Sequence, residues 1–285
     1  MRDVREAPAR GRPSQAVARQ RNRDVGAFRV SFRNPAAPGV PLLLLNGVGA
    51  ELRLWNNLRR NIARPSLAFD VQPRHLGRRP SMKTFATNVS HLLDDLQLDQ
   101  VDVLGLSWGG MAAQQLAHDH PDRVRRLVLA STTPGFVSVP AKPTSTLALL
   151  RPSRSAKRAE CLSKHLYAGD FLRDPSLIHR LGLLRPMDGR TYRRQMWAVT
   201  GWSSVLWLHS IRHETLILHG DDDPVVPFVN ARLMQQIMPN ATLQRVERGG
   251  HLYLYTRPQV HGRQINRFLS AADLKARARP ALTSG

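Results

Sequence analysis

Residues 101–110 read VDVLGLSWGG, and residues 111–120 continue as MAAQQLAHDH. The apolar run before Ser107 is typical of a strand buried on both faces, and the residues after it favour a helix. Ser107 lies between them, with Gly105 and Gly109 completing the pattern G-x-S-x-G. A strand, a sharp turn and a helix around such a serine form the setting of a nucleophile elbow. Serine is also a favoured helix N-cap, so this stretch by itself leaves both interpretations open.

Short apolar runs like the one before Ser107 recur along the chain as PLLLLNG, SLAFDV, VRRLVLAST and ETLILHGDDD. Each run has the length of one buried strand. Segments with helical patterning lie between most of them, at 51–64, 83–97, 107–119 and 228–238. Strands that alternate with helices predict βαβ units, and so an α/β fold with a mainly parallel, doubly wound sheet. A further strand, ATLQRVE, and an amphipathic helix at 257–275 close the pattern.

The same rhythm predicts how the chain is organised. The first residues are rich in Arg, Pro and Ala and are expected to be disordered, whereas AFRVSFR, directly after them, alternates as an edge strand does. Beyond VRRLVLAST the rhythm breaks into Pro, Gly, basic clusters and short amphipathic pieces, which predicts a helical lid insertion. The expected organisation is a leader at 1–25, an α/β core at 26–132 and 213–272, a lid at 133–212 and a flexible tail at 273–285.

The composition describes a basic protein of 285 residues with a formal net charge of +21. Hydrophobic residues make up 42% of the chain, which is enough to bury a full core. The single cysteine, Cys161, excludes an intramolecular disulfide and a cysteine-based zinc cluster. No apolar run is long enough to span a membrane, and no apolar segment follows the basic start as in a secretory signal. We therefore expect a cytoplasmic protein.

The positive charge suggests an anionic partner, but its distribution argues against specific nucleic-acid binding. The Lys and Arg residues occur in every segment, without the aromatic pattern or motif of a nucleic-acid-binding domain. A solvated, Arg-rich surface is the plainer explanation. Docking to an anionic particle or to a membrane surface is the alternative that the charge leaves open.

Candidate partners for Ser107 follow in the chain order that a nucleophile elbow requires. A serine hydroxyl becomes an effective nucleophile when a base accepts its proton, and that base needs an orienting carboxylate. In HGDDDPVVP, Asp223 ends the acidic run before a proline and is the preferred acid, with Asp222 as the alternative. His251 lies in the Gly-rich loop RGGHLYLY after the last strand and is the expected base. With these partners, Ser107 is predicted to be a nucleophile rather than a helix cap.

The turn after the strand PLLLLNG is the expected second half of an oxyanion hole. Trp108 follows the nucleophile, so its backbone N–H is the first expected donor. Gly47 and Val48 occupy the second donor position, and Val48 is the preferred residue. Asn46 and Gly47 are expected to shape this turn. Chemistry of this kind needs neither a metal nor an organic cofactor, and none is expected.

Several stretches together resemble the intracellular poly(3-hydroxyalkanoate) depolymerases of the medium-chain-length class. They are LLLLNGVGAEL, GLSWGG, AHDHPDRVRRLVLAST, GWSSVLWLHSI, LHGDDDPVVPFVNARLM and GGHLYLYTR, and the similarity extends from about residue 40 to 270. The stretch GWSSVLWLHSI is the most particular to this family of serine α/β-hydrolases of storage-polyester granules. FDVQPRHLGRRPS departs from the family, which has a Gly-rich turn there, so the preferred substrate length stays open.

The resemblance implies an α/β-hydrolase fold and a serine esterase that cleaves a medium-chain-length polyester. It assigns Ser107 as nucleophile, Asp223 as acid and His251 as base of an acyl-enzyme mechanism. The expected partners are a hydrophobic polyester or ester substrate and the surface of a storage granule. Two alternatives remain, which are another hydrolase of this fold acting on small esters or lactones, and a non-catalytic binding protein. The expected substrate-pocket residues are Asn46, Trp202, Trp207 and Leu252.

Overall fold

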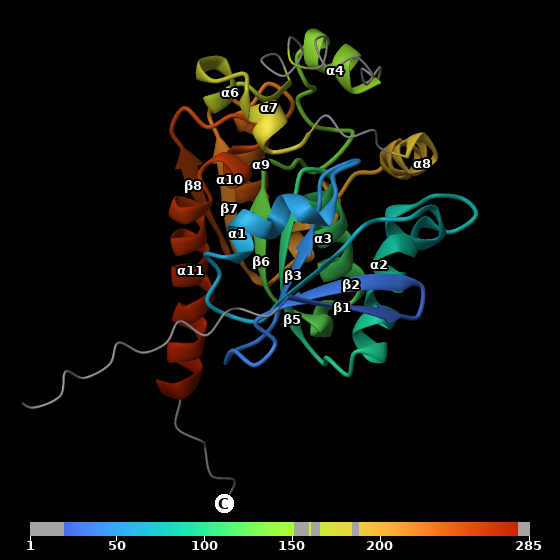
Figure 1. Ribbon diagram of the computed structural model, residues 1–285, viewed down its shortest axis with the longest axis vertical. Coiled ribbons are helices and arrows are strands. Elements are labelled where there is room, and N and C mark those ends of the chain that lie inside the picture. Colours follow the sequence, from blue (N-terminus) through green and yellow to red (C-terminus); the bar gives the residue numbers. More distant parts are fainter. Residues whose placement is uncertain (1–19, 151–159, 161–165, 184–187, 279–285) are drawn as a thin grey trace, which may run out of the picture.

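The computed structural model describes residues 20–150, 160, 166–183 and 188–278. Eight strands form one mixed sheet in the order β1-β2-β4-β3-β5-β6-β7-β8, with helices on both of its faces (Figure 1). The hairpin strands β1 and β2 pair antiparallel with each other, and β2 pairs antiparallel with β4. All the other neighbouring strands are parallel. The predicted α/β fold with a mainly parallel sheet is therefore confirmed.

The parallel strands β3 to β7 are short and buried along nearly their whole length, as the apolar runs predict, whereas β8 at the edge is buried only at Val246. Side chains that alternate between the two faces are all buried because helices cover both faces. The strands are β1 Gln20–Val25, β2 Phe28–Arg33, β3 Leu42–Leu45, β4 Ser66–Phe69, β5 Val101–Leu106, β6 Val124–Ala130, β7 Glu214–Gly220 and β8 Ala241–Val246.

Helices connect the parallel strands and also fill the region between β6 and β7. The α-helices are α1 Asn56–Arg59, α2 Met82–Asp95, α3 Trp108–Asp119, α4 Pro143–Leu150, α6 Asp170–Arg173, α7 Leu177–Arg180, α8 Gly189–Val199, α9 Phe228–Ile237, α10 Tyr253–Thr256 and α11 Pro258–Ala278. Four short 3-10 helices are η1 Leu52–Trp55, η2 Pro73–Leu76, η3 Pro121–Arg123 and η4 Leu208–Ser210. The helices α4, α6, α7 and α8 gather at one end of the sheet (Figure 1).

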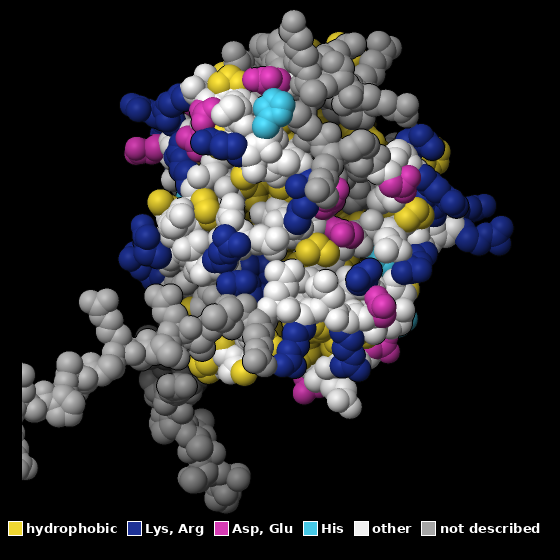
Figure 2. Space-filling view, viewed as in Figure 1, with side chains coloured by type: hydrophobic (Ala, Val, Ile, Leu, Met, Phe, Trp, Pro, Cys, Tyr) yellow, Lys and Arg dark blue, Asp and Glu magenta, His cyan; other side chains and the backbone are white. Residues whose placement is uncertain are grey.

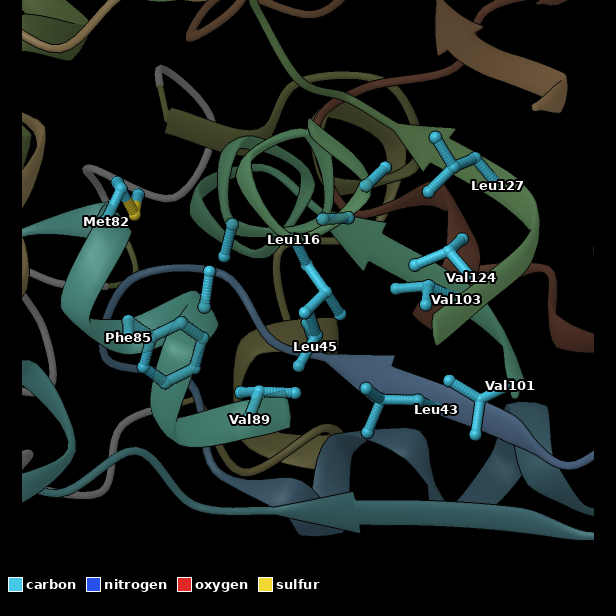
Figure 3. Packing of buried hydrophobic residues seen from close by; sticks show 14 of the residues in the cluster. Leu43, Leu45, Met82, Phe85, Val89, Val101, Val103, Leu116, Val124 and Leu127 are labelled. Atoms are coloured by element: carbon cyan, nitrogen blue, oxygen red, sulfur yellow. The ribbon is translucent and has the colours of Figure 1, made fainter. Parts of the chain in front are cut away.

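Two apolar clusters, one on each face of the sheet, make up the core. The first joins α2, α3 and α9 to the sheet, and Figure 3 shows Phe85 and Val89 of α2 meeting Leu45 of β3 within it. The second joins α1, α10 and α11 to the opposite face through residues such as Leu58 and Ile265. Burial on both faces fixes the register of the central strands, because a one-residue shift exchanges the two faces.

The predicted leader ends earlier than expected. Residues 20–25, assigned to the disordered leader, form β1, which pairs with β2 through a turn in which Gly26 has a φ of 52°. Because β1 is exposed except at Val25, it lacks the apolar pattern by which a strand is recognised. The sequence had predicted an edge strand for the run at 27–33. This run forms β2, which lies between β1 and β4 and is therefore not at the edge of the sheet. Residues 1–19 lie outside the described part of the chain.

The predicted tail also begins later than expected, because α11 continues to Ala278 and includes the first residues of 273–285. The run AADLKARA consists mostly of strong helix formers, so nothing in it ends the helix. Residues 279–285 lie outside the described part. The described residues of the region 133–212 form the helices α4, α6, α7 and α8 and the short helix η4, and they pair in strand fashion only at the bridge between Gly135 and Ser203. We call this region the insertion.

Candidate active site

The backbone at Ser107 has a φ of 53° and a ψ of −117°, which residues other than glycine rarely adopt. Its neighbours make this turn possible. A Cβ on Gly105 would lie 2.2 Å from the carbonyl oxygen of Gly109, and a Cβ on Gly109 would lie 2.1 Å from that of Leu45. Both positions therefore require glycine. The side chain of Ser107 makes no capping hydrogen bond to α3, so its hydroxyl is not used as a helix cap.

Asp223 and His251 form a buried pair at the ends of neighbouring strands. Nδ1 of His251 lies 2.8 Å from Oδ2 of Asp223. The backbone N–H groups of Val225 and Val226 both donate to Oδ1 of Asp223 at 2.9 Å. Burial raises the pKa of the Asp223 carboxyl. The charge and the hydrogen bond of His251 lower the pKa by more than burial raises it, so the net pKa lies below its ordinary value. Asp223 is thus held as a carboxylate that orients His251.

The other two acids of the DDD run face away from this pair. Oδ2 of Asp221 lies 2.6 Å from the guanidinium of Arg245, and Asp222 is exposed. Of the three carboxylates, the structure brings only Asp223 to His251. The geometry thus supports the preferred acid over its alternative, Asp222.

His219 is a buried neighbour of the pair that sequence reasoning missed. Its Nε2 lies 2.8 Å from the carbonyl oxygen of Val226 and 3.7 Å from Oδ2 of Asp223. Burial lowers the pKa of His219, which favours a neutral ring whose Nε2–H donates to that carbonyl. His219 thereby fastens the turn whose N–H groups hold Asp223. The only signal in the sequence is a histidine at the end of a buried strand, directly before GDDDP.

The turn after β3 lies against the nucleophile elbow. A Cβ on Gly47 would lie 3.5 Å from the Cβ of Ser107. Asn46 is buried beneath the turn, and its Oδ1 accepts a hydrogen bond from the hydroxyl of Tyr255 at 3.1 Å. The predicted role of Asn46 in shaping this turn agrees with that position, whereas a place in the substrate pocket does not.

Gln195 of α8 connects this turn to the elbow and was also missed by sequence reasoning. The backbone N–H of Gly49 donates to Oε1 of Gln195 at 2.8 Å. The indole Nε1–H of Trp108 donates to the backbone oxygen of Gln195 at 2.9 Å, and its ring packs edge-on against Phe85. The two expected sources of oxyanion donors are thus tied to one residue of the insertion. Nothing in the sequence marks a single glutamine in a helix for this position.

A cavity of about 160 Å³ opens in front of Ser107 and His251. Its walls are mainly aliphatic, with two tyrosines and a polar corner where the guanidinium of Arg53 pairs with Glu51. The insertion contributes to one side through α4 and the segments around α6 and α7. The lining residues are Gly47, Val48, Gly49, Ala50, Glu51, Arg53, Leu54, Leu106, Ser107, Leu149, Leu166, Tyr167, Gly182, Leu183, Val225, His251, Leu252 and Tyr255. An apolar acyl chain suits such a space.

The predicted pocket residues divide into two groups. Leu252 lines the cavity, and Val48 does so beside the elbow. Trp202 and Trp207 are not among the described residues that line the cavity. Trp202 donates to Oε1 of Gln115 at 2.7 Å, and the ring of Trp207 stacks on His118.

The prediction that Trp202 and Trp207 line the substrate pocket is therefore wrong. They pack on each other, with ring centroids 5.9 Å apart, and on the outer side of α3. They fasten the end of the insertion to the core. The sequence could not distinguish these positions, because five-residue spacing in an irregular segment does not indicate which side faces a cavity.

Two general features of the described residues bear on the kind of site. No group of three or more His, Cys, Asp or Glu side chains among them is placed to hold a metal ion. No helix in the described ranges has the length and apolar character needed to cross a membrane. The groups that the structure brings together at this cavity include a serine, a histidine and the carboxylate that contacts it.

A parallel sheet with a serine elbow, an acid after β7 and a histidine after β8 defines the class of the protein. Residues 42–260 match the model of the alpha/beta hydrolase family, and the chain belongs to this family. It is a hydrolase and a homologue of the poly(3-hydroxyalkanoate) depolymerase of Ectopseudomonas oleovorans. The two are 38% identical over 272 residues, which cover 90% of this chain and 94% of that protein.

Other relatives have different names within the same class. A 2-hydroxy-6-oxo-2,4-heptadienoate hydrolase of Pseudomonas putida is 30% identical over 255 residues, 82% of this chain and 91% of that protein. Among solved structures, a meta-cleavage product hydrolase from Pseudomonas fluorescens IP01 has a TM-score of 0.75 at 19% identity, covering 88% of this chain and 98% of that chain. An enol-lactonase from Burkholderia xenovorans LB400 has a TM-score of 0.73 at 18% identity, covering 88% and 100%. These structures confirm the fold.

Proposed function

We propose that this hydrolase cleaves the backbone ester bonds of a medium-chain-length poly(3-hydroxyalkanoate). The observation that carries the proposal is the buried contact of 2.8 Å between Asp223 and His251 at an apolar cavity that Ser107 also lines. The depolymerase of Ectopseudomonas oleovorans, 38% identical over nearly the whole chain, supports a polyester as the substrate. The aliphatic lining suits the alkyl side chains of such a polymer, because each buried methylene contributes about 0.8 kcal/mol to binding.

In this proposal, Ser107 and His251 carry out nucleophilic catalysis. The Ser107 hydroxyl attacks the ester carbonyl carbon while Nε2 of His251 accepts its proton. Asp223, held as a carboxylate, accepts the Nδ1–H hydrogen bond and stabilises the imidazolium. The C–O bond of the ester then breaks, and His251 returns the proton to the departing alcohol oxygen. In the second half, water gives a proton to His251 and attacks the acyl carbon, the bond from that carbon to Ser107 Oγ breaks, and His251 returns the proton to Ser107.

The tetrahedral intermediate carries a negative charge on the former carbonyl oxygen. The backbone N–H groups of Val48 and Trp108 are the proposed donors to this oxyanion. Removing one such donor typically lowers turnover by about 10²–10³-fold. The position of Gly47 against Ser107 supports this assignment, since the following N–H lies in the same turn.

A fluorophosphonate probe and a polyester assay test the proposal together. We expect the probe to label Ser107, and granules with C6–C10 3-hydroxyacyl units to be hydrolysed to soluble 3-hydroxy acids. The Ser107→Ala variant should lose both the label and the activity. Labelling at another residue would contradict the mechanism.

The same assay separates the alternatives of the same fold. A small-ester or lactone hydrolase would share the triad, and the 2-hydroxy-6-oxo-2,4-heptadienoate hydrolase relative belongs to this wider group. Hydrolysis of p-nitrophenyl butyrate and of lactones with inert granules would retain the mechanism and reject the polyester. A stable protein that takes no label and hydrolyses nothing would instead be a binding protein.

A further inference from the structure

The outer face of α8 combines two arginines with an exposed tryptophan. Arg190, Arg193 and Trp197 follow one another at spacings of three and four residues, so they lie on one side of the helix. All three are exposed, and Trp197 has 67% of its surface accessible. The opposite side, with Tyr192 and Gln195, is buried. Single exposed apolar side chains are common on protein surfaces, so the feature of interest is that Trp197 lies beside two arginines on the same helix face.

The segment between β4 and α2 extends this face with further cations. Arg194 of α8 donates to the backbone oxygen atoms of Gly77 and Arg78, which fastens the segment to the helix. Figure 2 shows Lys and Arg side chains gathered at the edge of the molecule where Figure 1 places α8 and this segment. We call the combined face the α8 surface. Its exposed members are Arg74, Arg78 and Arg79 of the segment, Lys83 at the start of α2, and Arg190, Arg193 and Trp197 of α8.

The neighbouring sequence offers little negative charge to neutralise these cations. Residues 71–93 and 189–213 contain no Asp or Glu. The carboxylate of Asp188, next to α8, accepts hydrogen bonds from the backbone N–H groups of Arg190 and Thr191 at the start of the helix. Within the described ranges, no ion pair involves any of the six cations of the α8 surface. With Asp188, whose charge is felt by Arg190, as the carboxylate beside six cations, the surface presents a net positive field.

Cations around a tryptophan on a convex helix suit a layer of anionic lipid headgroups. Lys and Arg are attracted to the negative headgroups, while an indole ring settles at the level between headgroups and acyl chains. A single-stranded nucleic acid is bound instead along a groove with several aromatic side chains. The α8 surface offers one such ring, Trp197, among its described residues.

We propose that the α8 surface docks this protein onto an anionic phospholipid layer. The inference rests on the proposed function in one respect, since a hydrolase of a water-insoluble polyester has to work at an interface. The inner side of α8 reaches the active site through Gln195, which contacts Gly49 and Trp108. Docking thus brings the catalytic turns to about one helix diameter, ~10 Å, from the lipid surface.

Sedimentation with vesicles tests the docking on the full-length protein. We expect binding to vesicles of phosphatidylglycerol and phosphatidylcholine, and no binding to phosphatidylcholine alone. Binding should weaken steeply between 0.05 and 0.5 M NaCl, since the Debye length falls from about 10 Å at 0.1 M to ~3 Å at 1 M. Equal binding to both kinds of vesicle, or binding that salt does not change, would overturn the proposal.

Variants with matched controls locate the surface. Removing two cations with Arg190→Ala/Arg193→Ala should weaken vesicle binding on the order of 25-fold, about fivefold for each residue. Arg263→Ala/Arg267→Ala removes the same charge from the exposed face of α11 and should leave binding within about twofold, by the same field argument. If both double variants weaken binding equally, net charge rather than the α8 surface is responsible.

The tryptophan distinguishes a lipid from a polyanion. Trp197→Ala should weaken vesicle binding several-fold, whereas Leu206→Ala, which also removes an exposed apolar side chain, should not. A 20-nucleotide single-stranded DNA that competes with vesicles and binds more tightly than they do would overturn the lipid assignment. Melting temperatures within about 2 °C of the wild type establish that each variant is folded.

These outcomes stay separate from the test of the proposed function. Vesicle binding needs no ester hydrolysis, so it can be measured with Ser107→Ala. A protein that binds anionic vesicles but hydrolyses no ester would reject the proposed function and keep the docking surface. A protein that hydrolyses polyester but does not bind the vesicles would keep the proposed function and reject the docking surface.

Discussion

Ser107, His251 and Asp223 lie on three different loops, and each loop holds its residue by a separate device. Two glycines that tolerate no Cβ form the turn at Ser107. The backbone N–H of His251 donates to the carbonyl of Tyr167 in the insertion, at 2.8 Å. Two N–H groups and the charge of His251 hold Asp223 as a carboxylate. The reacting groups are therefore positioned by backbone contacts that side-chain patterns do not reveal.

His219 is predicted to be a positioning residue for the acid. Replacing it with Phe removes the donor to the Val226 carbonyl and frees the turn that holds Asp223. We expect kcat for p-nitrophenyl octanoate to fall on the order of 10- to 100-fold with KM nearly unchanged, because small misplacements of catalytic groups have effects of this size.

A conservative variant is the control for this prediction. His219→Gln keeps an N–H donor at a similar reach and should recover part of the lost kcat. If His219→Phe and His219→Gln lose kcat equally, the hydrogen bond to Val226 has no part in the effect. If neither loses activity, His219 serves the packing of β7 alone.

At the scale of elements, one face of α8 contacts the turns of the active site and the opposite face is exposed to solvent. Its buried residue Gln195 accepts the N–H of Gly49, next to the proposed donor Val48. Its exposed Arg190, Arg193 and Trp197 face solvent. A partner bound to the outer face of α8 is thus one helix away from the turn that carries the proposed oxyanion donor Val48.

Gln195→Ala is expected to loosen the turn after β3. The N–H of Gly49 loses its acceptor, so Val48 is no longer held in one position. We expect kcat to fall about tenfold, less than the 10²–10³-fold that follows complete loss of an oxyanion donor. Steady-state kinetics on a soluble ester measures the change.

Gln195→Glu supplies the matched comparison, because a carboxylate oxygen accepts the same hydrogen bond. It should retain more activity than Gln195→Ala at pH 8. Equal losses in the two variants would assign the effect to helix packing rather than to the bond with Gly49.

At the scale of the whole molecule, buried histidines make the fold sensitive to acid. His75 is buried in η2, where its ring stacks on Phe28 and its Nδ1 accepts the N–H of Gln72. Burial lowers the pKa of His75 to about 4. It also lowers the pKa values of His219 and His261. These rings are neutral in the folded protein at pH values where the unfolded chain is already protonated.

The free energy of unfolding should therefore fall as the pH drops from about 6.5 to about 4. In this window the unfolded chain binds more protons than the folded protein, so stability rises with pH. Melting temperatures measured from pH 4 to 7.5 check the slope. His75→Gln removes one of the titrating groups and should flatten the curve. An unchanged slope in this variant would contradict the assignment to His75.

Much of the core was predictable because burial leaves a periodic mark on the sequence. The apolar runs before Ser107 and Asp223 predict β5 and β7, the segment ATLQRVE before His251 predicts β8, and the structure confirms all three as strands of the parallel part of the sheet. Strand β1 was missed for the opposite reason, since an exposed strand of Gln, Arg, Asn and Asp has no apolar period. The end of α11 was placed too early because no glycine or proline interrupts the run from residue 273 to Ala278, and the first proline after it is Pro280.

The sequence by itself determined the class of fold, the serine elbow and the chain order of serine, acid and histidine, because these depend on local pattern and spacing. Only the tertiary structure decided that Asp223 and not Asp222 meets His251, that Trp202 and Trp207 lie outside the cavity, and that α8 joins a basic outer face to the catalytic turns. Those facts depend on which side of a turn or helix meets a segment far away in the chain. Single-residue spacing carries no record of such contacts.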